Sequence, residues 1–151
     1  MSALPAPGLD RPRVLLVEDD QALREALRDF LEDFDVDVVG EAVDGREGVR
    51  MALDVDPDVV LMDLRMPVLG GIEAAGQIHE RRPDVPVIIL TAYDDPALKG
   101  GAERSGVYAY LVKGCPPREI TNATFEAWNE RRSRRGPGKA VRRITGERPD
   151  R

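Results

Sequence analysis

The chain has 151 residues, about one domain's worth, of which 42% are hydrophobic and 33% are charged. This composition is typical of a soluble globular protein and excludes general disorder. No apolar run approaches the ~18 residues of a membrane span, and the N-terminus lacks the apolar core of a signal peptide. The single cysteine, Cys115, excludes a disulfide scaffold and a cysteine-cluster metal site. We therefore expect a cytoplasmic protein without a membrane partner.

Charge is distributed unevenly along the chain. The chain has 22 basic and 28 acidic residues, and residues 131–151 contain nine of the basic and two of the acidic ones. This basic segment could contact nucleic acid or an acidic partner, or it could fold back on the acidic body. We expect a disordered lead at 1–11, a folded domain at 12–132 and a disordered basic tail at 133–151.

Strand-like and helix-like patterns alternate five times. Short apolar runs predict strands at 13–17, 36–39, 58–63, 87–90 and 108–112. Helical spacing of apolar residues, and prolines before the last helix, predict helices at 22–34, 44–53, 72–81, 96–104 and 117–132. Because the first, third and fourth strands are continuously apolar, we expect a parallel sheet covered on both faces. Two glycines, Gly100 and Gly101, predict a short, frayed or mobile fourth helix.

Chemically active side chains follow four of the predicted strands. Glu18 and Asp19 follow the first, Asp63 the third, Thr91 the fourth and Lys113 the fifth. The carboxyl ends of parallel strands meet at one edge, so these groups should share a cleft. Clustered carboxylates repel by about 4 kcal/mol per pair at 4 Å and an effective dielectric of 20, which a hard cation such as Mg²⁺ offsets. A carboxylate nucleophile beside a lysine and a hydroxyl is suited to phosphoryl transfer onto Asp63.

Four sequence segments carry a family resemblance. They are VLLVEDD (14–20), DVVLMDLRMP (58–67) followed by Gly71, ILTAY (89–93) and YLVK (110–113). On these segments the chain resembles the response-regulator receiver domain of two-component signalling over about residues 12–132. The resemblance implies a doubly wound, flavodoxin-like α/β fold with a five-stranded parallel sheet in the order 2-1-3-4-5.

The resemblance also assigns the acceptor and its ligands. Asp63 is then the phosphoacceptor, and Mg²⁺ (or Mn²⁺) is held by Glu18, Asp19, Asp63 and the backbone carbonyl of Arg65. Lys113 pairs with the phosphoryl group. The phosphoryl group would come from a histidine kinase or a phosphotransfer protein. The chain would be a self-catalysed phosphoacceptor with at most autodephosphorylation, rather than an enzyme with a separate substrate.

Four further positions receive roles from the resemblance. Thr91 is the switch hydroxyl, Tyr110 is the aromatic side chain that moves inward after phosphorylation, and Arg65 and Tyr93 tune the lifetime of the phosphoryl group. The switch would reshape the face made by the fourth helix, the fifth strand and the last helix. That face would bind a downstream protein or a second copy of the chain.

Three other functions compete with the phosphorylated switch. A phosphohydrolase usually needs a second acid two residues after its nucleophile, and that position is Arg65. A DNA-binding regulator would act through the basic tail or through a missing output domain, since the roughly twenty residues after the last helix are too few for a DNA-binding module. The chain is then a single-domain receiver or one cut from a longer protein. An unphosphorylated scaffold is disfavoured because every site residue is present.

Two side-chain environments are left open by the sequence. Phe125 and Trp128 are either partly exposed for a partner or packed against the preceding strand or the tail. Cys115 lies two residues after Lys113, so a lowered thiol pKa is conceivable, with an inert thiol as the default.

Overall fold

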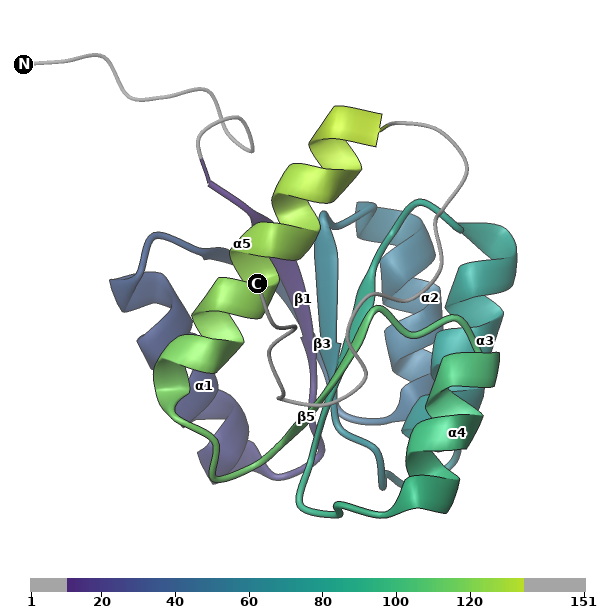
Figure 1. Cartoon of the computed structure of the whole chain (residues 1–151). Helices are drawn as coiled ribbons and strands as arrows, with labels where there is room; N and C mark the ends of the chain where they lie inside the picture. The colour runs from purple at the N-terminus through teal and green to yellow at the C-terminus, as the bar shows by residue number, and fades with distance from the viewer. Residues whose placement is uncertain (1–10, 135–151) are drawn as a thin grey trace, which may run out of the picture.

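Five strands and five helices alternate through residues 11–134, which are the residues that the computed structural model describes (Figure 1). The strands are β1 (Arg13–Val17), β2 (Asp37–Ala42), β3 (Val59–Met62), β4 (Val87–Thr91) and β5 (Ala109–Val112). The helices are α1 (Gln21–Asp33), α2 (Gly45–Val55), α3 (Gly71–Arg81), α4 (Pro96–Arg104) and α5 (Pro117–Arg134). The lead expected at 1–11 lies outside the described residues except for Arg11, and the expected tail lies outside them after Arg134.

The strands form one parallel sheet in the order β2-β1-β3-β4-β5, which confirms the predicted fold. Helices α1 and α5 cover one face, and α2, α3 and α4 cover the other (Figure 1). No helix within the described part of the chain combines the length and apolar character required to cross a bilayer.

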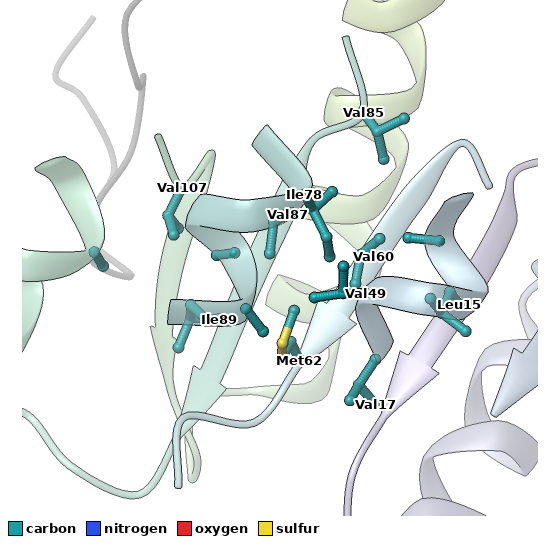
Figure 2. Close-up of a cluster of buried hydrophobic side chains, with 14 of the residues drawn as sticks. Leu15, Val17, Val49, Val60, Met62, Ile78, Val85, Val87, Ile89 and Val107 are labelled. Carbon is teal, nitrogen blue, oxygen red and sulfur yellow. The ribbon is translucent and has the colours of Figure 1, made fainter. Parts of the chain in front are cut away.

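The continuous apolar runs follow from this two-sided covering. Successive side chains of a strand point to opposite faces, so Leu15 packs on the α2–α3 side and Leu16 on the α1–α5 side. Figure 2 shows the hydrophobic cluster on the α2–α3 side, in which Val60 and Met62 of β3 meet Val49 of α2. Both faces of the central strands are therefore buried. This leaves the ends of the strands as the place for the predicted polar site.

The edge strand β2 differs most from its prediction. The expected strand at 36–39 is found at Asp37–Ala42, and most of its residues are only half-buried. Gly40 and Glu41 pair with β1 after a register shift between Val14 and Leu15. An edge strand with one solvated side does not need a continuous apolar run, and a search for such runs therefore places it too early.

Helix α1 begins as predicted and ends differently. Asp20 caps it, accepting a 3.2 Å hydrogen bond from the N–H of Leu23. Phe34, the last residue of the predicted helix, is the C-cap and is 51% exposed, because the helix ends at Asp33.

Helix α5 packs along the sheet through a buried tryptophan. Trp128 is only 6% exposed, so it packs inside the fold instead of being partly exposed. Its ring meets Phe125 edge to face at 5.8 Å, and the Arg132 guanidinium lies 4.4 Å from the ring centroid.

An arginine anchors the C-terminal end of α5 at the amino edge of the sheet. Arg131 lies 2.9 Å from Asp58, 3.0 Å from Asp84 and 3.2 Å from Asp56 in charge-assisted contacts. Asp58 immediately precedes β3, and Asp84 lies in the loop before β4. This anchor is at the opposite end of the strands from the predicted site.

Candidate functional site

Three carboxylates meet at the carboxyl edge of the sheet. Glu18 and Asp19 follow β1, and Asp63 follows the adjacent strand β3, which is paired with β1 so that Val17 lies opposite Met62. The residues after two paired parallel strands are neighbours for this reason. One oxygen from each carboxylate lies within 4.8 Å of the others. The structure therefore brings together the acidic group that the sequence predicted.

A lysine that follows the edge strand β5 contacts two of these acids. The Nζ atom of Lys113 is 3.4 Å from Asp63 Oδ1 and 3.5 Å from Glu18 Oε1. Its backbone N–H donates a 2.6 Å hydrogen bond to the carbonyl of Thr91. That bond extends the pairing of β4 and β5 and fixes where the lysine leaves the sheet.

Glu18 is the most buried of the acids. Only 3% of the residue is exposed, and burial raises the pKa of its carboxyl, with further raising by Asp63 and Asp19. A hydrogen bond from the Asp20 N–H, at 3.1 Å, and the charge of Lys113 lower this pKa. The raising effects prevail, chiefly because the carboxyl is buried.

Asp63 is held by contacts with the loop that follows it and with the start of α3. Its Oδ1 atom accepts a 2.8 Å hydrogen bond from the Leu64 N–H. A Cβ added at Gly71 would lie 2.2 Å from the Asp63 carbonyl, which no side chain permits. Glycine at position 71 therefore lets the first turn of α3 pack directly against the backbone of Asp63.

Thr91 and Tyr110 meet on the backbone of one residue. Both are fully buried. The Tyr93 N–H donates to Thr91 Oγ1 at 3.1 Å, and the Tyr110 hydroxyl donates to the Tyr93 carbonyl at 2.6 Å. Burial, followed by the charges of Asp95 and Asp94, raises the pKa of Tyr110, which keeps the hydroxyl protonated as a donor. The ring of Tyr110 is thus already inward in this structure.

A cation–π pair joins the loops after β3 and β4. The guanidinium of Arg65, after β3, lies 4.3 Å from the ring centroid of Tyr93, after β4. The backbone carbonyl of Arg65 remains an expected metal ligand. For Cys115, the hypothesis of a lowered thiol pKa is wrong. Burial and then the charge of Glu119 raise the pKa of this thiol.

Comparison with known families decides what this arrangement is. The model of the response regulator receiver domain matches residues 14–125. The chain belongs to this family.

Relatives of this receiver domain are response regulators. It is 43% identical over 112 residues to the transcriptional regulatory protein LiaR of Bacillus subtilis (strain 168), covering 74% of this chain and 53% of LiaR. It is 38% identical over 120 residues to the response regulator UvrY of Escherichia coli (strain K12), covering 79% of this chain and 55% of UvrY. The chain therefore spans about half the length of these relatives.

Solved structures agree with the fold. The receiver domain of the putative response regulator NarL from Mycobacterium tuberculosis superposes with a TM-score of 0.75 at 30% identity. The match covers 79% of this chain and 97% of the NarL chain. The similarity thus extends over essentially a whole receiver domain.

Receiver domains generally bind Mg²⁺, and the donor set of this one suits that ion. The three carboxylates of Glu18, Asp19 and Asp63 offer hard oxygen ligands within reach of one centre. One of them is buried with a raised pKa, so a divalent charge would offset the repulsion inside the cluster.

Sequence reasoning missed one residue that contacts the site. The Nη1 atom of Arg24 donates a 2.8 Å hydrogen bond to the carbonyl of Glu18. The available signal was a basic residue in the first turn of a helix that follows an acidic strand end, a position where cations are disfavoured.

Proposed function

We propose that this receiver domain is a cytoplasmic, phosphorylation-dependent signalling switch whose acceptor is Asp63. The observation that carries the proposal is the assembly around that carboxylate: Lys113 at 3.4 Å and two further acids, at the sheet edge where β1, β3 and β5 end. The phosphoryl donor is the phosphohistidine of a histidine kinase or of a phosphotransfer protein. The folded receiver is assigned to residues 12–132.

The transfer forms one bond and breaks one. The Asp63 carboxylate attacks phosphorus, an O–P bond forms, and the P–N bond to the donor imidazole breaks. The imidazole keeps the electron pair of that bond and takes up a proton. Both contacts described for the carboxylate are made by Oδ1, with the Leu64 N–H and Lys113, and we assign the other oxygen as the nucleophile.

Positive charge around the transferred phosphoryl group comes from Lys113 and would also come from a bound Mg²⁺. The Lys113 ammonium is placed to pair with phosphoryl oxygens once Asp63 carries them. Mg²⁺ would be held by the carboxylates of Glu18, Asp19 and Asp63 and the carbonyl of Arg65, and it supplies positive charge to the phosphoryl oxygens. The chain itself is then the phosphoacceptor and acts on no separate substrate. Its only further reaction is the loss of its own phosphoryl group.

The signal leaves the site through the loop between β4 and α4. When the Thr91 hydroxyl turns to a phosphoryl oxygen, it gives up the hydrogen bond from the Tyr93 N–H. The Tyr93 carbonyl holds Tyr110, so the same movement acts on β5 and reshapes the face made by α4, β5 and α5. That face binds a downstream protein or a second copy of the chain.

The decisive test is the intact mass of the chain after incubation with acetyl phosphate, with and without Mg²⁺. We expect one phosphoryl group that depends on Mg²⁺ and is absent from Asp63→Asn. Thr91→Ala should still be phosphorylated but respond less in partner binding. A phosphorylated Asp63→Asn chain, or a wild-type chain that neither binds Mg²⁺ nor is modified, would overturn the proposal.

The competing functions have less support. At the position where a phosphohydrolase usually carries a second acid, the Arg65 side chain stacks on Tyr93. DNA binding through the basic tail concerns residues 131–151, which lie outside the described residues after Arg134. Salt-dependent duplex binding that is lost on removal of residues 131–151, with Asp63 phosphorylation unchanged, would support that function instead.

A further inference from the structure

Arg24 occupies a position where an arginine needs a specific reason. It lies in the first turn of α1, directly after the loop that carries Glu18 and Asp19. A cation there faces the positive end of the helix dipole. Side chains of a helix lean toward its N-terminus, so a long side chain at this position reaches back to the preceding loop.

The Arg24 guanidinium connects three elements. Its Nη1 atom donates to the Glu18 carbonyl at 2.8 Å, and its Nε atom donates to Glu41 Oε1 at 3.0 Å. Glu41 belongs to β2, so α1, the acidic loop and the edge strand are tied together. The Arg24 side chain is only 14% exposed, which strengthens contacts that solvent would otherwise screen.

The hydrogen bond from Arg24 to the Glu18 carbonyl holds the backbone between Glu18 and Asp19, two of the proposed metal ligands. The Glu18 N–H donates to the Ala42 carbonyl at 3.0 Å, and its Oε2 atom accepts from the Asp20 N–H at 3.1 Å. Arg24 adds the remaining backbone contact, at the carbonyl that joins Glu18 to Asp19. Repulsion among the three carboxylates pushes this turn away from Asp63, and a fixed carbonyl opposes that movement.

We propose that Arg24 is a positioning residue for the metal site, which keeps the carboxylates of Glu18 and Asp19 directed at Asp63. The proposal rests on the proposed function, since it concerns the same Mg²⁺ site. Arg24 acts through the Glu18 carbonyl, while its charge is balanced by Glu41. Groups that orient metal ligands in this way change metal affinity by about 10- to 100-fold when they are replaced.

The chain offers a matched control one turn further along α1. Arg28 also pairs with Glu41, and with Glu32 at 3.2 Å, but its side chain is 45% exposed. Within the described part of the chain, the Arg28 guanidinium contacts these two acids and not the acidic loop. Replacing Arg28 therefore disturbs the same Glu41 and leaves the Glu18 carbonyl bound.

The experiment is a calorimetric titration of Mg²⁺ into the full chain and three variants, with the thermal midpoint of each measured without metal. We expect Arg24→Met to bind Mg²⁺ about 10-fold or more weakly, and Arg28→Met to bind as the wild type does. Arg24→Lys should recover part of the affinity, because one ammonium can bind the Glu18 carbonyl without reproducing the planar fork. Arg24→Lys also carries the test if Arg24→Met does not fold.

Each contrary result has its own meaning. Wild-type affinity in both Arg24 variants would overturn the positioning role alone. Equal weakening in Arg28→Met would also overturn it, because a general loss of α1 packing would then explain the effect. A wild-type chain that binds no Mg²⁺ would overturn the proposed function, and the positioning role with it.

Discussion

The hydroxyl of Tyr110 donates a 2.6 Å hydrogen bond to the backbone carbonyl of Tyr93. The N–H of the same residue is bound by Thr91 Oγ1 at 3.1 Å. One residue of the β4–α4 loop thus carries both contacts, although Thr91 and Tyr110 lie on different strands. In the proposed switch, a displacement of the threonine hydroxyl would reach the tyrosine through this single backbone segment.

Replacing Tyr110 with phenylalanine removes only the donor of this bond. We expect the free energy of unfolding to fall by about 1–2 kcal/mol, because the Tyr93 carbonyl loses a buried partner. Phosphorylation of Asp63 should continue, while the phosphorylation-dependent change in hydrogen exchange across α4 should shrink. Urea unfolding and exchange with and without acetyl phosphate measure the two effects. An undiminished exchange response in Tyr110→Phe would contradict the coupling.

Glu18 makes metal-free stability depend on pH. Its pKa is raised above the ordinary value of 4.5, chiefly by burial, so the folded state favours the protonated carboxyl. The stability contributed by this group is therefore present below that ordinary pKa and is lost as pH rises through the folded-state value. We expect metal-free Glu18→Gln to be more stable than the wild type at pH 7.

Added Mg²⁺ should reverse that order. The wild type gains about 2.7 kcal/mol when the ion is present at 100 times its Kd, whereas Glu18→Gln loses a ligand and gains less. Thermal unfolding from acidic to neutral pH, with Mg²⁺ or with a chelator, measures both effects. The exposed Glu80→Gln on α3 is the control and should follow the wild type. A metal-free Glu18→Gln that is less stable at pH 7 would refute the sign.

The two glycines inside α4 are not required by space. A Cβ at Gly100 would come no closer than 3.3 Å to the flexible end of Arg104, and one at Gly101 no closer than 3.5 Å to Ile72. Alanine at either position should stabilise the chain by about 0.5–1 kcal/mol and increase hydrogen-exchange protection of α4. Urea unfolding provides the free energies.

A third glycine provides the contrasting control. Gly106, after α4, has φ of +84° and would place a Cβ 2.7 Å from the ring of His79. Gly106→Ala should therefore destabilise the chain under the same conditions. Loss of stability in all three alanine variants would mean that the α4 glycines serve a packing need.

The Arg65–Tyr93 stack should lengthen the life of the phosphoryl group. It joins the loops after β3 and β4, and we expect this contact to limit the access of water to Asp63. An exposed stack of this kind is worth about 0.5–1 kcal/mol, so Arg65→Ala should shorten the phosphorylated half-life by about two- to fivefold. Tyr93→Phe retains the ring and should decay as the wild type does. The decay is followed by intact mass after removal of the donor, and an unchanged half-life in Arg65→Ala would reject the role.

The acidic site could be predicted because its residues lie where the strands end. Glu18, Asp63 and Lys113 are neighbours as a consequence of a parallel sheet, and a sheet of that kind can be inferred from continuous apolar strands. Trp128 and Cys115 show the limit of this reasoning. The environment of each depends on how α5 docks on the sheet, and for Cys115 burial and the charge of Glu119 raise the pKa of the thiol.

The contacts around the site were less accessible from the sequence. Whether Tyr110 points inward is decided by one loop carbonyl, and the contact from Arg24 to Glu18 depends on a side chain's path across a turn. Neither leaves a periodic pattern in the sequence. The edge strand β2 was misplaced for a related reason, since its solvated side carries no continuous apolar signal.

Helix α5 runs from the site edge of the sheet to the opposite edge, where Arg131 is bound by Asp58 and Asp84 (Figure 1). Because Arg131 holds the last turns of α5, we expect any displacement of this helix on phosphorylation to be larger at its first turn, at Pro117, than at Arg131. A partner that recognised the proposed phosphorylated state through α5 would then distinguish the two states best at the turns nearest Asp63.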